Sequence, residues 1–289
     1  MTNTRGKEVK DNTNCFFVSD LHGKLDRYEK LFEQIRKEKP EIVFFGGDLY
    51  PSFKLLLNSK IDFFEDIFVK YFEDLYSDMG DDYPEFFIIL GNDDPKSEEV
   101  RFQDKKFNKL WNYIHNRKNN FKGYEIYGYA NIPPSPFIYK DWELYDVSRY
   151  VDPGSIHPTE GKRSVDPQRD IEYATIKKDL EKLFSDINPN KTIVLFHSPP
   201  FKSNLDRADL EGKYIDHVPM DVHVGSIAIK EFIENKQPLL TMHGHIHESS
   251  RLTGSWKQIT GKTHSFNAAI DTNQLSIITF DIKMIKNSG

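Results

Sequence analysis

CFFVSDLHGKLDRYEKLFEQIRKEKPEIVFFGGD, residues 15–48, decides the fold class. The stretch begins with CFFVS (15–19) and ends near IVFF (42–45), two short apolar runs that predict β-strands. Between them, apolar residues recur at spacings of three and four: Leu25, Tyr28, Leu31, Phe32 and Ile35. This period predicts a helix over about 25–38. A strand, a helix and a strand in succession predict an α/β fold.

An aspartate follows each of these two strands. Asp20 comes after the first strand, and Asp48 follows two glycines after the second. In open α/β sheets, ligands bind outside the carboxyl ends of the strands. The two aspartates therefore indicate a candidate site at this edge of the predicted sheet.

The same kinds of element continue along the chain. Further strands are predicted over 86–90, 124–130, 137–140, 142–147, 192–196, 239–242, 265–271 and 275–282, and further helices over 53–79, 169–186 and 225–235. The stretches 148–168 and 198–224 are predicted to be long irregular loops, which at this length are often functional. The polar residues 1–13 are predicted to form a mobile arm. Because the chemically informative residues run from 20 to 247, we expect a single domain over 1–289.

Composition and charge exclude some classes of function. A net charge of −6 and a pI of about 5.9 give no strong electrostatic case for nucleic acid or an anionic membrane. The apolar runs are too short to cross a bilayer, so no membrane association is expected. The N-terminus lacks the apolar segment of a secretory signal, and the single cysteine, Cys15, cannot form an internal disulfide. We expect a cytoplasmic protein, whose oligomeric state the sequence does not indicate.

Residues of types that bind metals follow five apolar runs of the chain: Asp20 with His22, Asp48, Asn92, His197, and His245 with His247. Any one of them alone has an ordinary explanation, such as a helix cap or a turn. Five in the same position relative to a strand indicate a shared site. In extended chain, residues two apart point to the same side, so each Asp-x-His or His-x-His pair can present two ligands together.

The chemistry of these side chains indicates which cations they suit. A mixture of carboxylate, amide oxygen and imidazole suits manganese, iron, zinc, cobalt or nickel. No thiolate accompanies them, which disfavours a structural zinc site.

Taken in order, the motifs DLH (20–22), GGD (46–48), GND (91–93), FHSPP (196–200) and GHIH (244–247) resemble those of the calcineurin-like metallophosphoesterases. The resemblance covers about four-fifths of the chain. It implies a four-layer α/β-β/α sandwich, in which two mixed β-sheets pack together between flanking helices. It also implies two divalent metal ions at the strand ends.

Carried over by position, the resemblance implies ligands for both metal ions. Asp20, His22 and His247 bind the first metal, and Asn92, His197 and His245 bind the second, with Asp48 bridging the two. Such a pair of cations lowers the pKa of a shared water, and the resulting hydroxide attacks phosphorus in line. The function implied is hydrolysis of a phosphate-ester substrate, with catalytic roles for Asp48, Asn92 and Asp93.

Asp93 departs from the family's pattern, which has histidine after Gly-Asn. That histidine can act as a general acid, whereas a carboxylate beside two cations is expected to have a low pKa and to donate protons poorly. A carboxylate also repels dianionic monoesters more than monoanionic diesters. We therefore expect a phosphodiesterase. In the alternative interpretation, Asp93 turns away and caps the turn before Pro95.

Three further features are weaker candidates for substrate binding. His223 precedes a predicted helix whose N-terminus favours phosphate. His243 lies two residues before the GHIH histidines and is expected behind or beside the site. Lys162 and Arg163 offer positive charge to an anionic substrate, although a solvated turn is the favoured explanation for them. With Asn92, His223 and His243 complete the predicted substrate contacts, and selectivity is expected from the loops 148–168 and 198–224.

Other functions remain as alternatives. One is a phosphomonoesterase or protein phosphatase of the same fold, and another is a catalytically weak binding scaffold. A metallo-β-lactamase-type site fits poorly, because its motif requires Asp and then His where this chain has His247 and Glu248. A scaffold would have no need of all seven expected ligands.

Overall fold

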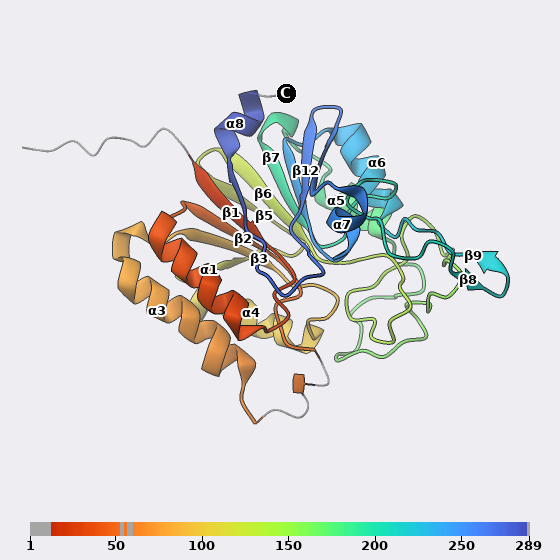
Figure 1. Ribbon diagram of the computed structural model, residues 1–289, viewed down its shortest axis with the longest axis horizontal. Coiled ribbons are helices and arrows are strands. Elements are labelled where there is room, and N and C mark those ends of the chain that lie inside the picture. The colour runs from red at the N-terminus through yellow and green to blue at the C-terminus, as the bar shows by residue number, and fades with distance from the viewer. Residues whose placement is uncertain (1–12, 53–54, 57–59, 288–289) are drawn as a thin grey trace, which may run out of the picture.

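The computed structural model describes residues 13–52, 55–56 and 60–287 (Figure 1). The predicted mobile arm at 1–13 lies outside these residues except for Thr13, which is buried. No helix within the described part combines the length and apolar character needed to cross a membrane.

The first sheet has the order β13-β1-β2-β3-β4. Its strands are β1 (Asn14–Val18), β2 (Ile42–Gly46), β3 (Glu85–Ile89), β4 (Asn112–Tyr113) and β13 (Ile278–Asp281). The first four run parallel, with Phe16 opposite Val43 and Phe44 opposite Phe87, and β13 pairs antiparallel with β1. The carboxyl ends of β1, β2 and β3 therefore meet at one edge.

The second sheet has the order β11-β12-β10-β7-β6-β5. Its strands are β5 (Arg117–Phe121), β6 (Tyr124–Tyr129), β7 (Thr192–Phe196), β10 (Leu240–His243), β11 (Lys257–Thr260) and β12 (Thr263–Asn267). The four central strands are parallel, and β5 and β11 pair antiparallel at the edges. A separate two-stranded ribbon joins β8 (Tyr214–Ile215) to β9 (Val218–Pro219).

Helices cover the outer faces of the two sheets (Figure 1). The longer ones are α1 (Leu25–Glu38), α3 (Lys70–Met79), α5 (Ile176–Leu183) and α6 (Ile227–Lys236). The shorter ones are η1 (Phe63–Val69), η2 (Gly80–Asp82), η3 (Lys96–Glu98), α4 (Glu99–Phe102), η4 (Lys105–Phe107), η5 (Pro189–Lys191), α7 (Ser249–Thr253) and α8 (Ile282–Asn287). Two mixed sheets flanked by helices confirm the predicted architecture.

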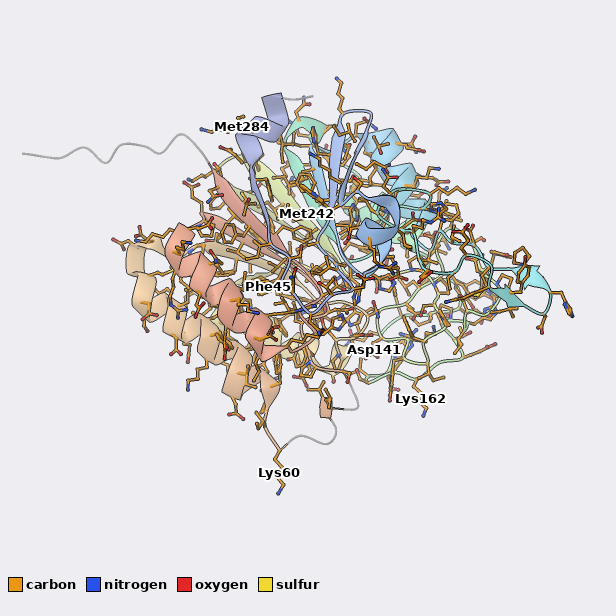
Figure 2. The ribbon with its side chains drawn as sticks, viewed as in Figure 1. Phe45, Lys60, Asp141, Lys162, Met242 and Met284 are labelled. Carbon is orange, nitrogen blue, oxygen red and sulfur yellow. The ribbon has the colours of Figure 1, made fainter. Side chains whose placement is uncertain are left out.

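Alternation along β7 shows how the layers are held together. Ile193 and Leu195 belong to the core that also takes side chains from the first sheet, whereas Val194 and Phe196 pack with α5 and α6. Both sets are buried, as expected for a parallel strand covered on both faces. Figure 2 shows Met242 inside the fold, while Lys60 and Lys162 extend outward from it.

Two predicted helices are shorter than expected. Within the stretch predicted as one helix over 53–79, residues 55–56 are helical, residues 60–62 are not, and 53–54 and 57–59 lie outside the described residues. A helix begins again at Phe63, where Asp62 caps it by accepting the Phe64 and Glu65 N–H groups. The helix predicted over 169–186 spans only α5. Thr175 caps its first turn, accepting the Lys178 N–H.

The strands predicted over 137–140 and 142–147 are wrong. This stretch forms only isolated bridges, such as that between Ile132 and Glu143. All of residues 140–146 are buried, so the alternation of a half-buried strand is absent. Pro133, Pro134 and Pro136 just before it lack the N–H groups that a ladder needs.

Candidate metal centre

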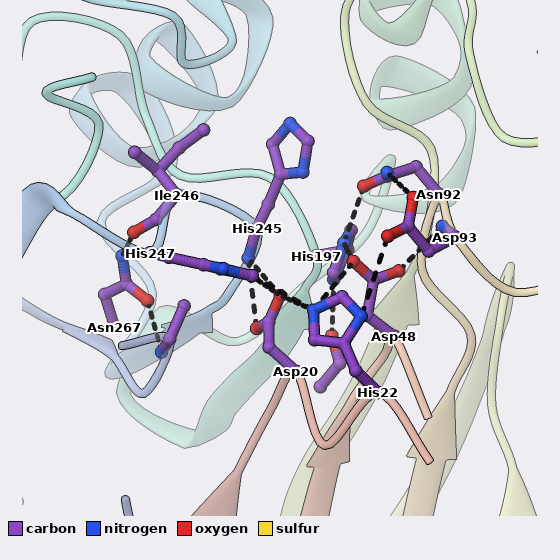
Figure 3. A network of polar contacts seen from close by, with 12 residues as sticks. Asp20, His22, Asp48, Asn92, Asp93, His197, His245, Ile246, His247 and Asn267 are labelled. Atoms are coloured by element: carbon purple, nitrogen blue, oxygen red, sulfur yellow. Dashed lines mark hydrogen bonds and ion pairs between the residues drawn. The ribbon is translucent and has the colours of Figure 1, made fainter. Parts of the chain in front are cut away.

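The predicted ligands come together where the two sheets meet, on loops that leave five strands. Asp20 follows β1, Asp48 follows β2, and Asn92 follows β3; His197 follows β7, and His245 and His247 follow β10. We call residues 19–23, 46–49, 90–94, 197–198 and 243–247 the ligand loops. Figure 3 shows their side chains converging from both sheets.

Backbone hydrogen bonds join the first two ligand loops side by side. The N–H groups of Asp20, His22 and Gly23 donate to the carbonyls of Gly47, Asp48 and Leu49, at 2.8–2.9 Å. Four predicted ligands have positive φ: Asp20 (58°), His22 (50°), Asp48 (54°) and His245 (69°). Each such non-glycine residue costs on the order of 1 kcal/mol or more, and strain of this kind is concentrated at functional sites.

Two glycines allow the close approach of the ligand loops. A Cβ on Gly91 would lie 2.2 Å from Oδ1 of Asp48, and one on Gly244 would lie 2.4 Å from Oδ2 of Asp20. Both distances are far below van der Waals contact. The glycines of GND and GHIH are therefore required by the packing of the carboxylates beside them.

One group of side chains consists of Asp20, His22 and His247, whose nearest ligand atoms all lie within 4.8 Å of one another. Nε2 of His247 is 3.0 Å from Oδ1 of Asp20 and 3.1 Å from Nε2 of His22. Burial raises the pKa of Asp20, but its hydrogen bond with His247 and the neighbouring histidines outweigh burial and lower it. An ionised carboxylate and two imidazole nitrogens thus face one point.

A second group consists of Asp48, His197 and His245. Oδ2 of Asp48 lies 3.3 Å from Nε2 of His197 and 4.0 Å from Nε2 of His22, so this carboxylate stands between the two groups. Its other oxygen accepts the Asp93 N–H at 2.8 Å. The amide oxygen of Asn92 is 3.0 Å from Nε2 of His197 and points into the same group.

The protonation of His197 indicates whether the second group of side chains could bind a cation. Nδ1 of His197 lies 2.7 Å from the Gly46 carbonyl, which can only accept, so Nδ1 carries a proton. A neutral His197 therefore directs the lone pair of Nε2 at the oxygens of Asn92 and Asp48. Burial lowers the pKa of His197, yet Asp48 outweighs it and raises the pKa to about 10. The group demands positive charge at this point, and a divalent cation meets that demand.

Asp93 and Asp94, adjacent in sequence, have different surroundings. The Asp93 side chain is 44% exposed, with Oδ2 3.6 Å from Nδ1 of His22, so it faces the site. Asp94 is buried and caps the turn: its carboxylate accepts N–H groups from Leu49, Tyr50 and Gly91, each at 2.8 Å. The capping role considered for Asp93 thus belongs to Asp94.

The protein's own charges act on Asp93 in the direction opposite to the one predicted for the metal-loaded site. Repulsion by the Asp48 carboxylate, with burial added, raises the pKa of Asp93 to about 7. Cations beside Asp48 would oppose this effect, so the low pKa expected for the loaded site stays a prediction.

Three positioning residues were missed from the sequence. Asp94 is one. Arg27 is buried, and its guanidinium donates to the carbonyls of Asp20 and Thr272. The amide of Asn267 donates to the Ile246 carbonyl at 3.2 Å, and so holds the GHIH loop (Figure 3). Asp94 directly follows the GND motif (91–93), and this position was its one indication in the sequence.

Of the weaker candidates for substrate binding, only His223 lines the cavity beside the ligand loops. Its Nδ1 lies 2.8 Å from Oδ1 of Asp206. His243 is fully buried, and its two ring nitrogens contact the Ser198 carbonyl and the Thr241 hydroxyl. Its predicted substrate contact is therefore wrong.

The basic pair also lies away from the site. The Lys162 side chain is exposed, and Arg163 donates to the Pro158 carbonyl at 3.0 Å. Neither residue lines the cavities beside the ligand loops. The solvated turn is the better description of Lys162.

Comparison with known proteins bears on this arrangement. Residues 14–249 match the sequence profile of the calcineurin-like phosphoesterase family. No curated protein sequence matches the chain. Among solved structures, TT1561 of Thermus thermophilus is similar with a TM-score of 0.51 and 15% identity, over 94% of this chain and 99% of that one. The phosphopantetheinyl hydrolase PptH of Mycobacterium tuberculosis is similar with a TM-score of 0.50 and 11% identity, over 90% and 89% of the chains. At these identities the two structures show a shared fold.

Proposed function

Since this chain belongs to the calcineurin-like phosphoesterase family, we propose that it is a metal-dependent phosphoester hydrolase that prefers phosphodiesters. The observation that carries the proposal is the position of Asp48, whose carboxylate stands between two groups of ligand-type side chains. We assign Asp20, His22 and His247 to one divalent cation and Asn92, His197 and His245 to the other, with Asp48 shared. When bound, such cations neutralise charge on the phosphoryl oxygens and lower the pKa of a water.

The side chains of this site prepare it for that chemistry. Asp48 is fixed from two directions, because the Asp93 N–H holds Oδ1 while Oδ2 faces His197. The Gly46 carbonyl fixes the tautomer of His197, a contact that orients a metal-binding imidazole. The Asn92 amide turns its oxygen toward His197 and its NH₂ toward Asp93. These contacts support the assignment of two cations to this site.

Asp93 and the space around it support the preference for diesters. The carboxylate of Asp93 faces the site and repels a dianionic monoester more strongly than a monoanionic diester. Two cavities, of about 660 and 250 Å³, both reach Asn92 and Asp93, with Phe137 lining each. There is room for two organic substituents on one phosphate.

Metal removal tests the proposed activity. EDTA should abolish hydrolysis of bis(4-nitrophenyl) phosphate, and manganese, cobalt or nickel should restore more of it than magnesium, which prefers an oxygen octahedron. Protein purified without chelator should contain close to two transition-metal ions per chain. Well under one ion per chain would favour the binding scaffold, and best rescue by magnesium would contradict the ligand assignment.

Substitution of Asp93 tests the diester preference. Asp93→His removes the carboxylate that repels a dianionic monoester, and it supplies a general acid, which is worth about 10²–10⁴ in rate where the leaving group needs a proton. The variant should therefore raise kcat/KM for 4-nitrophenyl phosphate, and more strongly for alkyl monoesters, relative to the matched diester. Asp26→His, at an exposed aspartate of α1, is the control. Unchanged values in Asp93→His, or a wild type that strongly prefers alkyl monoesters, would contradict this role of Asp93.

A further inference from the structure

The larger cavity extends from the ligand loops into a region that takes no part in holding cations. Besides residues of the ligand loops and Glu248, its lining comes from residues 133–155 and 201–227, which lie far apart in sequence. We call residues 131–155 and 201–225 the cavity wall. In Figure 1 these segments lie together beyond the carboxyl ends of the strands, with the β8–β9 ribbon at their outer end.

The wall is mainly apolar where it lines the cavity. Its apolar lining residues are Pro133, Pro134, Pro136, Phe137, Val147, Tyr150, Val151, Pro153, Phe201, Ala208, Leu210, Val218, Pro219, Met220 and Val224. Several of them leave large apolar surfaces in solvent: Tyr150 is 69% exposed, Phe137 53% and Val218 47%. Burial of such surface by an apolar partner is favourable.

The charged side chains that line the cavity beyond the ligand loops are acidic. No lysine or arginine lines the cavity among the described residues, whereas four carboxylates line it outside the ligand loops' own aspartates: Asp146, Asp152, Asp221 and Glu248. Burial and the neighbouring Asp221 both raise the pKa of Asp152, as expected where no cation separates two carboxylates.

The lysines and arginines of the wall itself do not line the cavity; they are Lys140, Arg149, Lys202, Arg207 and Lys213. The exposed Lys202 places its ammonium over the Phe201 ring, 5.2 Å from its centre, and Arg149 pairs with Glu172 at 3.1 Å. A second negative group on a substrate would therefore meet carboxylates in this cavity with no cationic side chain lining it.

We propose that the substrate is a phosphodiester whose organic group is extended, largely apolar and without negative charge. This inference rests on the proposed hydrolase activity and specifies its substrate class. The same observations argue against nucleic acids and nucleoside polyphosphates, since no lysine or arginine among the described residues lines the cavity to pair with an additional phosphate.

A matched series of esters tests the proposal. The substrates are 4-nitrophenyl phosphodiesters whose second substituent is methyl, octyl or 7-carboxyheptyl. Full burial of one CH₂ group of a substrate raises kcat/KM about fourfold. The octyl ester has seven more CH₂ groups than the methyl ester, and we expect them to be partly buried. The value of kcat/KM should therefore rise about a hundredfold from methyl to octyl. The 7-carboxyheptyl ester should lose at least about tenfold relative to octyl, because its carboxylate enters an acidic cavity.

Substitutions in the wall test whether the cavity is the cause. Val218→Lys adds a cation at an exposed lining residue and should raise the carboxyheptyl-to-octyl ratio of kcat/KM about tenfold. Tyr150→Lys is an independent variant with the same expected direction. Ile259→Lys, on β11, changes an exposed apolar residue outside the cavity lining and should leave the ratio unchanged.

Measuring the binding of compounds that need not be hydrolysed distinguishes this inference from the proposed activity. The dissociation constants of methylphosphonate monoesters with methyl, octyl and carboxyheptyl groups are measured by calorimetry on the metal-loaded protein, where no turnover is needed. Tighter binding of the octyl compound supports the inference even if no ester is hydrolysed, an outcome that overturns the activity alone. Hydrolysis without dependence on chain length, or a wild type that favours the carboxyheptyl ester, overturns the inference and leaves the activity standing.

Discussion

The ligand loops and the cavity wall border the same cavity but are held in different ways. Each ligand loop leaves a buried strand that is paired on both sides, so its position is set by the two sheets. No residue between Ala130 and Thr175 belongs to a helix or to a ladder longer than an isolated bridge. That part of the wall depends on side chains such as Glu143, which accepts the Ser135 N–H and hydroxyl and pairs with the buried Lys140.

Positive φ at non-glycine residues occurs in both regions, at Asp20, His22, Asp48 and His245 in the ligand loops and at Lys202, Asp216 and His217 in the wall. In the ligand loops, the sheet before each of these residues fixes its backbone. The wall has no such support, and its apolar side chains line a cavity. A rigid centre with an irregular wall is the usual arrangement when the reaction is constant and selectivity is set by loops.

The largest effect is expected at the residue that both ligand groups share. Asp48→Ala should abolish activity and stoichiometric metal binding, because the two cations lose the anion between them. His22→Ala or His247→Ala should mainly weaken the first cation. Metal content by mass spectrometry and kcat/KM on a diester measure these effects, with Asp26→Ala as control. Full activity in Asp48→Ala at ordinary metal concentrations would contradict the assignment.

The sequence predicted the ligand loops better than their supports, and for a physical reason. Asp48 and His197 each end an apolar run, and the carboxyl ends of parallel strands meet at one edge. Asp94 could not be assigned in the same way, because its role depends on N–H groups from Leu49 and Tyr50, which only the folded chain brings to it.

The errors in the wall have a related cause. WELYDV (142–147) has the composition of a strand, yet the chain before it carries Pro133, Pro134 and Pro136. The side chains of Asp141 and Glu143 accept hydrogen bonds from backbone N–H groups of other segments. In a strand, such N–H groups would bond to the carbonyls of a neighbouring strand. Composition predicts that such a segment is buried, but the identity of its hydrogen-bond partners depends on distant parts of the chain. His243 shows the same limit: its spacing from His245 suggested the site, and its burial excludes it.

The next effect concerns the support of the ligand loops. Asp94→Ala leaves three buried N–H groups without an acceptor, at about 1–3 kcal/mol each. We expect a loss of about 3 kcal/mol in the free energy of unfolding, measured by urea in the presence of EDTA. Because Asp94 links the loop after Asp48 to the loop of Asn92, kcat/KM should also fall about 10²-fold, the size expected for a displacement of about 1 Å.

Two further variants serve as controls for the effect of Asp94→Ala. Asp94→Asn keeps one acceptor oxygen and should lie between Asp94→Ala and wild type. Asp104→Ala removes an exposed aspartate that caps η4 through the Lys106 N–H, and should cost about 1 kcal/mol without lowering activity. If Asp94→Ala behaves like Asp104→Ala, the turn does not depend on this carboxylate.

The smallest effect on global stability is expected in the wall, at Asp206. Its buried carboxylate accepts the N–H groups of Lys202 at 2.9 Å and Gly225 at 3.1 Å, and so ties the two ends of residues 201–225 together. If the wall opens separately from the sheets, Asp206→Ala should lower global stability by only about 1 kcal/mol, because the free energy of a local opening limits the loss. Amide hydrogen exchange should accelerate within 201–225, while the strands and the content of two cations per chain stay unchanged, and Asp206→Asn should show a weaker form of the same pattern. A loss as large as that of Asp94→Ala, with faster exchange throughout both sheets, would mean that the wall and the ligand loops unfold as one unit.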